Sequence, residues 1–547
     1  MTLKQQNNPI TEVDAVVIGA GFSGLYMLYR LREAGFSTKV VEAASGVGGV
    51  WYWNRYPGAR CDSESIYYNY SFSEELYKEW TWSSRYPEQP EILRYLNFVA
   101  DKFDLRKDIQ FNTRVNSAAY DEEQNRWQVQ LDSGELVSAK YFITGVGCIS
   151  TANLPNIKGV DQFKGGWYHT GHWPHEKVDF TGKRVGVIGT GSSGIQSIPV
   201  IAKEAAHLTV FQRTPQFSVP AKNRPYDPEF IRQTKENYQE IRRQMRETPI
   251  GVGAQYRDRS ILDDTPEERQ KVLQEAWDKG GWHILFAYND LITNEEGNKL
   301  VADFVRSKIQ EIVKDPETAA KLAPDHYYGT KRAIIDTDYF ETYNRDNVSL
   351  VDVKKAPIQE ITENGIRTAD GEYELDVIVF ATGFDGMTGS LFKIDIKGRD
   401  GVSLKEKWEN GAQTRTYLGL TTAGFPNMFM LTGPESPSVL GNMPAAIEQH
   451  VEWVSDCLEH LRENNVAVIE PEGKAEDEWS HHCRELADAT LYVKTDSWYT
   501  GANIPGKARG FQIYVGGYAP YRQICDEVAE KDYEGFSLTV AEQTTPS

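Results

Sequence analysis

Near the N-terminus, a short apolar run, a group of glycines and a helical pattern follow one another. In DAVVIGAGFSG (14–24), residues 16–18 form a continuous apolar, β-branched run, as expected of a strand buried on both faces of a parallel sheet. The stretch that continues to Gly35 has leucines on one helical face, at Leu25, Leu28 and Leu31. This order predicts a strand, a tight turn, and a helix that ends at Gly35.

The same order returns further along the chain. KRVGVIGTGSSG (183–194) repeats the apolar run and the glycines, and the helical stretch IQSIPVIAKEA and the strand-like stretch LTVFQRT follow it. Strands that alternate with helices in this way predict an α/β fold with parallel sheets. We therefore predict two Rossmann-like domains, the units that bind dinucleotides.

The spacing of the glycines indicates the ligand class. Both units fit the pattern G-x-G-x-x-G, with Gly19, Gly21 and Gly24 in the first and Gly189, Gly191 and Gly194 in the second. In this pattern the first glycine permits the turn, the second lets the backbone approach a pyrophosphate, and the third lets helix and strand pack closely. The N-terminus of the helix then presents free N–H groups to the phosphates. Two such sites in one chain suggest FAD in one and a nicotinamide dinucleotide in the other.

The residue at the end of the next strand distinguishes the two ligands. In the first unit this strand, STKVVEAAS, contains Glu42, which is placed to accept hydrogen bonds from ribose hydroxyls. In the second unit Arg213 and Thr214 stand at this position. A carboxylate would repel a 2′-phosphate, whereas a guanidinium binds it with two hydrogen bonds. We therefore predict NADPH rather than NADH at the second site; a solvated arginine at a strand end is the alternative.

An aromatic, glycine-bearing loop follows the first unit, at GVGGVWYWNRYPGARCD (46–62). Gly49 allows the backbone to approach a bulky ligand, and we expect Trp51, Trp53 and Tyr56 to form a wall beside a flavin ring. A packed aromatic core under a loop is the other interpretation. The two are compatible, because a flavin pocket is itself an apolar wall with a few polar groups.

Composition and charge exclude several classes of function. The chain of 547 residues has 79 acidic and 59 basic residues and a net charge of −20, which disfavours nucleic-acid and anionic-membrane partners. The five cysteines are scattered, with no C-x-x-C pair, so we expect no structural metal site and a reducing compartment. The N-terminal stretch has no apolar signal region. We expect a cytoplasmic enzyme that contacts no membrane.

The segment 224–328 differs from both units, because it is charged and helical in pattern. TPEERQKVLQEAW begins with Thr265, Pro266 and Glu268, a capping box that predicts a helix start. DPETAAKL repeats the device at Asp315. We find no nucleotide or metal chemistry here and predict a helical insertion that shapes a substrate cavity.

One segment, FKGGWYHTGHWP (163–174), is too aromatic for an ordinary linker, and we judge it too broken for a helix or strand. It resembles the fingerprint F-x-G-x-x-x-H-x-x-x-W-P of the Baeyer–Villiger monooxygenases, through Phe163, Gly165, His169, Trp173 and Pro174. It also stands in the expected place, between the two glycine patterns. The chain resembles this family along nearly its whole length, and most of all the phenylacetone and steroid monooxygenases.

The resemblance implies a fold and a reaction. It implies a discontinuous FAD domain (1–145 and 387–547), a discontinuous NADP domain (150–223 and 329–386), and the helical insertion 224–328 between the parts of the latter. The fingerprint segment would link the two domains. The implied enzyme inserts an oxygen atom of O2 beside a ketone carbonyl, using FAD, NADPH and a flavin C4a-peroxide, and forms an ester or lactone. Its partners would be O2 and a small ketone, with the oligomeric state left open, a monomer included.

The resemblance also assigns roles to individual residues. Arg332, in GTKR, would be the catalytic cation, and Asp62 its acidic partner. Arginine suits this role because it does not readily lose its proton. Lys331 would contact NADP, and Trp498 would close over the nicotinamide. The segment Ser438, Val439 and Leu440 would border the substrate pocket, and its resemblance to the aryl-ketone and steroid branch suggests large cyclic or aryl ketones.

Three alternatives remain open at this stage. A flavin-dependent N- or S-oxygenating monooxygenase shares two Rossmann units, although the final Trp-Pro of the fingerprint and the Asp62–Arg332 pair favour ketone chemistry. A disulfide reductase would need two neighbouring redox cysteines, and Cys61 is alone in its region. A flavin-bearing electron-relay protein would need neither Arg332 nor a second dinucleotide site. The identity of the ketone does not follow from the sequence.

Overall fold

The computed structural model describes residues 10–541, and its larger sheet has eight strands. Seven lie in the order β17-β4-β5-β6-β1-β2-β3, and the eighth, β18, pairs with β6. The bounds are β1 Ile10–Ile18, β2 Thr38–Val41, β3 Ile109–Gln110, β4 Val115–Asp121, β5 Arg126–Leu131, β6 Leu136–Thr144, β17 Asp395–Lys397 and β18 Met428–Met430. Strands β1, β2, β3, β6 and β18 run parallel. Segments from both ends of the chain therefore build this sheet.

The second sheet has five strands, all parallel, in the order β12-β9-β8-β16-β7. They are β7 Gly166–His169, β8 Arg184–Ile188, β9 His207–Gln212, β12 Val348–Asp352 and β16 Val377–Phe380. Between β12 and β16 along the chain, three further strands form an antiparallel sheet: β13 Ile358–Thr362, β14 Gly365–Thr368 and β15 Gly371–Glu374. The predicted α/β fold with two parallel units is confirmed.

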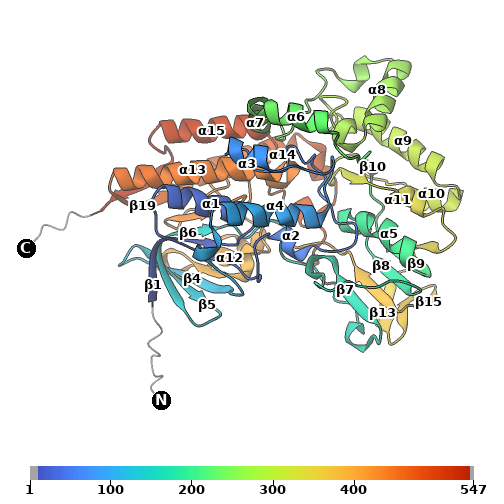
Figure 1. Cartoon of the computed structure of the whole chain (residues 1–547), viewed down its shortest axis with the longest axis horizontal. Coiled ribbons are helices and arrows are strands. Elements are labelled where there is room, and N and C mark those ends of the chain that lie inside the picture. Colours follow the sequence, from blue (N-terminus) through green and yellow to red (C-terminus); the bar gives the residue numbers. More distant parts are fainter. Residues whose placement is uncertain (1–9, 542–547) are drawn as a thin grey trace, which may run out of the picture.

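Each of the two sheets carries the helix predicted after its glycine pattern. Helix α1 (Phe22–Glu33) follows β1, and Gly35 stands just past its end with φ of +77°. Helix α5 (Ser192–Glu204) follows β8. Helix α13 (Met443–Glu463) lies beside α1 (Figure 1), and Arg30 of α1 donates a 3.0 Å hydrogen bond to Ser455 of α13. Residues of both helices pack in one apolar core with Val17 of β1 and Ile143 of β6, so the two helices cover one face of the larger sheet.

The remaining elements surround these layers. The helices are α2 Val50–Trp53, α3 Glu74–Glu79, α4 Gln89–Lys102, α11 Tyr339–Thr342, α12 Leu404–Lys407, α14 Gly473–Asp488 and α15 Tyr518–Glu530. Two further strand pairs are β10 Ser218–Pro220 with β11 Ile334–Asp336, and β19 Val466–Pro471 with β20 Phe536–Val540.

The insertion forms a helical lobe, drawn in green at the upper right of Figure 1. Its helices are α6 Pro228–Glu236, α7 Tyr238–Glu247, α8 Pro266–Lys279, α9 Glu295–Ile312 and α10 Pro316–Leu322. The capping box of Thr265 and Glu268 is present, and the Asp315 side chain caps α10. Trp277, Val301 and Val305 pack in a common apolar core. The predicted helical character of this segment is therefore confirmed.

The prediction for the segment 163–174 was wrong in one respect. Residues Gly166–His169 form strand β7, which pairs in parallel with β16, so that His169 is opposite Phe380. Without β7, β16 would be the edge of the sheet and would expose its backbone hydrogen-bonding groups. Tertiary pairing thus orders a segment whose own composition does not favour a strand.

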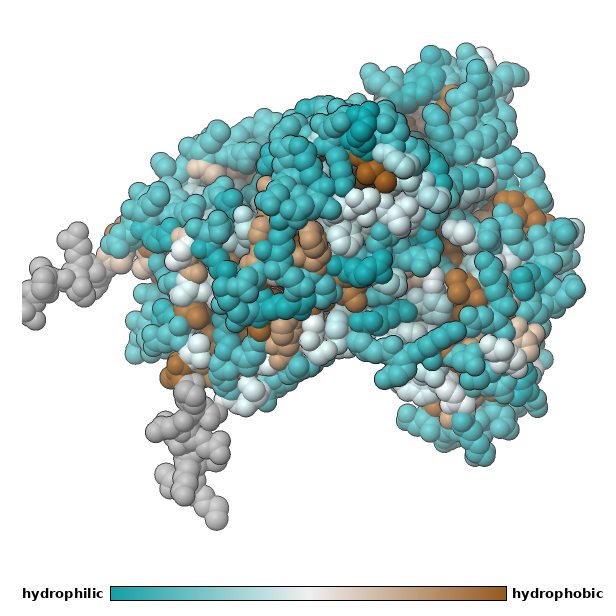
Figure 2. All heavy atoms as spheres, viewed as in Figure 1, coloured by the Kyte–Doolittle hydropathy of each residue, from teal (hydrophilic) through white to brown (hydrophobic). Residues whose placement is uncertain are grey.

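The viewed surface is mainly hydrophilic (Figure 2). Among residues 10–541, no helix has the length and apolar character needed to cross a bilayer.

Candidate active site

The first glycine pattern forms a tight backbone cradle between β1 and α1. Gly19 has φ of +100°, and a Cβ built on it would lie 2.6 Å from the Gly145 carbonyl oxygen. A Cβ on Gly24 would lie 1.8 Å from the Gly19 oxygen. Gly21 faces Gly49, and a Cβ added to Gly49 would lie 3.0 Å from the Gly21 Cα. A side chain at Gly21 or Gly49 would therefore fill the space where the loops approach each other, which fits a pyrophosphate cradle.

Glu42 lies at the end of β2, beside this cradle. The amides of Ala20 and Ala44 donate to its carboxylate at 2.6 and 2.7 Å. Burial raises the pKa of Glu42 above its usual value, although these amides oppose the effect. The carboxylate is thus held rigidly next to the glycines, where the predicted ribose would lie.

The second cradle repeats this geometry between β8 and α5. Gly189 has φ of +107°, and its added Cβ would lie 2.4 Å from the Ala381 oxygen; a Cβ on Gly194 would lie 2.3 Å from the Gly189 oxygen. Around the Cβ position of Gly191, by contrast, no heavy atom of residues 10–541 lies within 4 Å, apart from Gly191 itself and its two chain neighbours. Open space in front of the second glycine is what close approach by a dinucleotide requires.

Basic side chains gather near the end of β9. Arg213 is exposed there, and the Thr214 carbonyl accepts a 3.1 Å hydrogen bond from Thr190 beside the glycines. Burial lowers the pKa of Lys331; the Asp325 carboxylate opposes this and the charge of Arg213 adds to it. Arg213 and Lys331 are therefore close enough to interact, although 118 positions separate them in the sequence.

Arg332 and Asp62 form a bidentate ion pair. The Nε and Nη2 groups of Arg332 each donate to one carboxylate oxygen of Asp62, both at 2.8 Å. The third group, Nη1, donates to the Val439 carbonyl oxygen. Burial disfavours the charged guanidinium, but Asp62 outweighs this effect and raises the pKa of Arg332 further above its ordinary value. Arg332 is therefore a permanent cation that Asp62 holds by one edge.

Two aromatic side chains lie near Arg332. The guanidinium carbon of Arg332 lies 5.3 Å from the ring centroid of Trp282, which comes from the insertion. Burial raises the pKa of Tyr499 to about 12, and the charge of nearby Arg332 lowers it in part. Neither aromatic residue was predicted from the sequence.

An apolar cluster lies against the ion pair and contains most of the predicted pocket residues. Val439 and Tyr499 are buried in it with Cys148, and Leu440 and Trp498 pack against it. The ring of Trp498 lies so close to Gly386 that a Cβ there would be 2.9 Å from its Cε3 atom. The cluster provides the water-poor surroundings that strengthen electrostatic interactions.

The loop before this cluster is strained. Thr432, Glu435 and Ser438 have φ of +55°, +63° and +28°, in the region that favours glycine. Ser438 is fully buried, and its hydroxyl has no hydrogen-bond partner within the described part of the chain. Backbone strain and an unpaired buried hydroxyl tend to concentrate at functional sites.

In the loop after the first cradle, Trp51 and Tyr56 contact different units. The Trp51 indole N–H donates to the Tyr68 hydroxyl at 3.0 Å, and Tyr68 packs in the same core as Cys61, next to Asp62. Tyr56 instead donates a 2.7 Å hydrogen bond to Gln196 of α5, in the second unit. Tyr56 therefore joins the two units, and Trp51 remains on the side of the first cradle.

The fingerprint residues pack within the second unit and against the segment that follows β6. The Gly171 amide donates to His169 Nδ1 at 2.9 Å, so the ring proton resides on Nε2, which lies 3.2 Å from the Asn153 carbonyl oxygen. Burial lowers the pKa of His169 to about 4. Phe163 and Trp173 are buried, Pro174 follows Trp173, and a Cβ on Gly165 would lie 2.3 Å from the Asp376 oxygen. None of these contacts reaches Arg332 directly.

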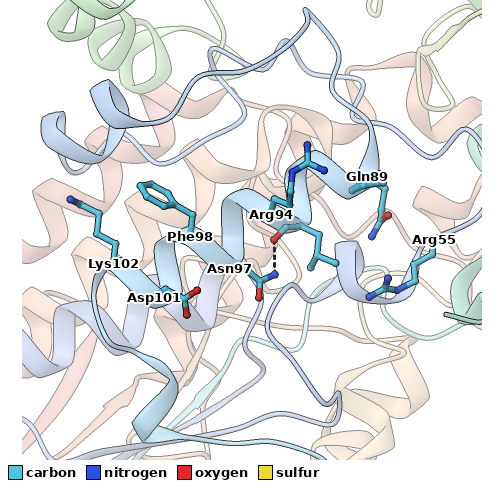
Figure 3. Close-up of a pocket in the computed structure, with 9 residues that line it drawn as sticks. Arg55, Gln89, Arg94, Asn97, Phe98, Asp101 and Lys102 are labelled. Atoms are coloured by element: carbon cyan, nitrogen blue, oxygen red, sulfur yellow. Dashed lines mark hydrogen bonds between the residues drawn. The ribbon is translucent and has the colours of Figure 1, made fainter. Parts of the chain in front are cut away.

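The hollow shown in Figure 3 does not contain the Arg332–Asp62 pair. It lies along the outer face of α4, where Arg55, Gln89, Arg94 and Asn97 line it. Asn97 donates a 2.7 Å hydrogen bond to the Leu93 carbonyl within this helix. Since neither Arg332 nor Asp62 lines the hollow, it is not the candidate active site.

Comparison with known proteins gives a consistent result. Residues 13–233 match a family described as FMO-like, flavin-binding monooxygenase-like. A Baeyer–Villiger monooxygenase of Pseudooceanicola batsensis is 46% identical over 537 residues, covering 97% of this chain and 97% of that protein. The phenazine N-monooxygenase PhzNO1 of Lysobacter antibioticus is 45% identical over 536 residues, covering 97% and 98%.

Solved structures are also similar over nearly the whole chain. An oxidised steroid monooxygenase bound to NADP has a TM-score of 0.93 and 51% identity, with 97% of this chain and 100% of that chain covered. A complex of OTEMO with FAD and NADP has a TM-score of 0.93 and 42% identity, with 96% and 99% covered.

Proposed function

Because this chain belongs to the Baeyer–Villiger monooxygenases, we propose that it inserts one oxygen atom of O2 beside a ketone carbonyl, giving an ester or lactone, with FAD and NADPH as cofactors. The observation that carries the proposal is the Arg332–Asp62 pair: a permanent cation, bound at 2.8 Å by both oxygens of its partner, beside a buried apolar cluster.

The two cradles fit the two cofactors. Gly19, Gly21, Gly24 and Gly49 would hold the FAD pyrophosphate, with Glu42 at its ribose and Trp51 near its ring. Gly189, Gly191 and Gly194 would hold the NADPH pyrophosphate, with Arg213, Thr214 and Lys331 at the 2′-phosphate and Trp498 near the nicotinamide. When bound, FAD reduced by NADPH supplies the activation of O2.

The protein residues supply charge, orientation and exclusion of water. Arg332 would stabilise the negative charge that develops on the carbonyl oxygen of the ketone as oxygen is added. Asp62 holds two of the three donor groups of Arg332, which leaves Nη1 to turn from the Val439 carbonyl towards substrate. The apolar cluster would keep water from the reacting atoms.

We further propose large cyclic or aryl ketones as substrates. The steroid monooxygenase with 51% identity supports this class, as does the segment Ser438, Val439 and Leu440, of which Val439 and Leu440 belong to the cluster.

A second candidate function is oxygenation of a ring nitrogen in a heteroaromatic compound. It is favoured by the phenazine N-monooxygenase, which is 45% identical over nearly the whole chain. That protein and the Baeyer–Villiger relative have almost the same identity to this chain, so identity alone does not separate the two reactions.

One experiment separates them. Purified enzyme with FAD and NADPH is given cyclic, linear and aryl ketones, including a steroid ketone, and in parallel phenazine; products are identified by mass spectrometry. We expect esters or lactones with molecular masses 16 units above the ketones. N-oxides without any ester would reject the main proposal in favour of the second.

The domain division, cytoplasmic location and oligomeric state also remain proposals. We propose the FAD domain as 1–145 and 387–547 and the NADP domain as 150–223 and 329–386, which agrees with the ranges that contribute strands to each sheet. We propose a cytoplasmic location, supported by five scattered cysteines that form no C-x-x-C pair, and leave the oligomeric state open, a monomer included. Light scattering in solution measures the mass directly.

A further inference from the structure

Trp282 makes two contacts with the segment that carries the catalytic cation. Its ring centroid lies 5.3 Å from the guanidinium carbon of Arg332. Its indole N–H donates a 3.1 Å hydrogen bond to the carbonyl oxygen of Ala333, the next residue. The ring is therefore tied to the backbone beside Arg332 at the same time as it contacts the side chain.

The backbone before Trp282 has a conformation that serves this placement. Trp282 lies in a short 3-10 helix, Gly281–Ile284, directly after α8. Gly280 and Gly281 have φ of +68° and +63°, and Cβ atoms there would lie 2.5 Å from the Pro220 oxygen and 2.1 Å from the Tyr86 hydroxyl. Only glycine fits both positions, so the turn that delivers Trp282 is specified by sequence.

A second arginine anchors this turn to the loop that holds Asp62. Arg85 donates to the Lys279 carbonyl at the end of α8, at 2.8 Å, and to Glu64, at 2.7 Å. Asp62 and Glu64 are two residues apart on one loop. That loop therefore holds Arg332 directly through Asp62, and the Trp282 turn indirectly through Arg85.

We propose that Trp282 is a positioning residue for Arg332 in the reaction proposed above. Asp62 fixes the guanidinium within its plane through two hydrogen bonds, but leaves it free to tilt about that edge. The indole ring of Trp282 covers one face of the guanidinium and prevents this tilt. As a result, Nη1 moves only between the Val439 carbonyl and the substrate. A cation–π contact of this kind attracts the guanidinium to the ring face, more strongly where water is excluded.

This role differs from ordinary packing within the insertion. Trp277, five residues earlier on α8, is buried in the core of the same lobe and lies beside Phe304, with ring centroids 6.3 Å apart. It provides a matched control, since loss of its ring should destabilise the lobe without any change next to Arg332.

The test compares Trp282→Leu, Trp282→Phe and Trp277→Leu with the parent enzyme. The first measurement needs no cofactor: the rate at which phenylglyoxal modifies Arg332, followed by peptide mass spectrometry. We expect a several-fold faster rate in Trp282→Leu, a smaller rise in Trp282→Phe, which keeps the ring face, and the parent rate in Trp277→Leu. The same rate in the parent and in Trp282→Leu, or an equal rise in Trp277→Leu, would overturn the inference.

The second measurement is the fraction of consumed NADPH that appears as ester rather than hydrogen peroxide. We expect this fraction to fall several-fold in Trp282→Leu and to recover partly in Trp282→Phe, with the KM for NADPH unchanged. An unchanged fraction in Trp282→Leu contradicts the inference. If the parent forms no ester at all, the proposed function fails, and the phenylglyoxal rates still decide whether Trp282 confines Arg332.

Discussion

At the residue scale, the proposed function depends on whether Asp62 can keep the buried guanidinium of Arg332 charged and oriented. Burial disfavours the charge on Arg332, but two hydrogen bonds of 2.8 Å to Asp62 and the attraction between the charges outweigh it. Breaking one partner of such a pair leaves an uncompensated charge. Loss of either Asp62 or Arg332 should therefore disturb both the orientation and the charge balance of the residue that remains.

Replacement of Arg332 by alanine should abolish ester formation while both cofactors still bind. Removal of a donor that stabilises developing negative charge costs at least about a hundredfold in rate. Arg332→Lys should also be impaired, because an ammonium group cannot bind Asp62 in the same bidentate way. Ester formation is measured by gas chromatography, and FAD content by absorbance.

Arg415→Ala is the matched control, since Arg415 forms a half-exposed ion pair with Asp477. It should retain the parent rate. Normal ester formation by Arg332→Ala would refute its assignment as the catalytic cation.

Replacement of Arg213 by alanine should raise the KM for NADPH by about tenfold or more, because a charge-assisted bond to the 2′-phosphate is lost. The KM for NADH, which has no such phosphate, should not change. Steady-state kinetics with both nucleotides test this. A parallel rise for NADH would show that Arg213 does not read the 2′-phosphate.

At the element scale, the two strand–turn–helix units use the same backbone contacts. The third glycine of each pattern touches the carbonyl of the first, at 1.8 Å for an added Cβ in the first unit and 2.3 Å in the second. These glycines set the distance between strand and helix. The middle glycine of the second unit has a different role, since open space lies in front of it.

Two alanine variants of the second unit should therefore behave differently. Gly194→Ala should lower the melting temperature, because its Cβ meets a backbone oxygen that cannot easily move. Gly191→Ala should change the free energy of unfolding by no more than about 0.5 kcal/mol, yet weaken NADPH binding, because the methyl group occupies the ligand's space. Calorimetry and NADPH titration measure the two effects, and FAD content should stay constant. Equal losses of stability in both variants would contradict this division of roles.

At the scale of the whole molecule, two chain segments run side by side between the sheets. The Asn153 amide donates to the Gly383 carbonyl at 2.9 Å, and the Asp385 amide donates to the Thr151 carbonyl at 2.8 Å. His169 contacts both segments, with Nε2 at 3.2 Å from the Asn153 oxygen and 3.2 Å from the Thr382 hydroxyl. The fingerprint histidine therefore fastens the connection between the two units, and does so in its neutral form.

This neutral histidine should make stability depend on pH. Burial lowers its pKa from 6.5 to about 4, so between these values the unfolded chain binds a proton that the folded protein does not. The part of the free energy of unfolding that depends on neutral His169 is fully present above pH 6.5. It is lost as the pH falls towards 4, by up to roughly 3 kcal/mol.

A comparison with His169→Gln isolates this effect. Buried Glu435 and Glu448, whose pKa values burial raises to about 7, have the opposite influence, because their folded forms retain protons as the pH falls below 7. Both contributions remain in the variant and cancel in the difference. We expect the parent's advantage in free energy of unfolding, from urea titrations, to shrink between pH 7 and pH 4. A difference that is constant across this range would contradict a neutral, buried His169.

The sequence by itself determined the two glycine patterns, the strands and helices around them, the acid of the first unit and the arginine of the second. The residues that specify each unit lie within about 30 positions of one another, so local backbone geometry and helical periodicity determine how they are arranged. The caps at Thr265 and Asp315 were predictable for the same reason. The pairing of Arg332 with Asp62 came from resemblance to a family, since nothing local connects positions 270 residues apart.

The tertiary structure alone decided the rest of the site. Strand β7 forms because it pairs with the otherwise unpaired edge of β16. The contacts of Arg332 with Trp282, Tyr499 and the Val439 carbonyl join four distant parts of the chain. These side chains carry no local signal, because an aromatic ring or a backbone carbonyl has the same sequence pattern in a core as beside a catalytic cation. The packing of the insertion and the C-terminal segment against the two sheets determines which rings and carbonyls contact Arg332.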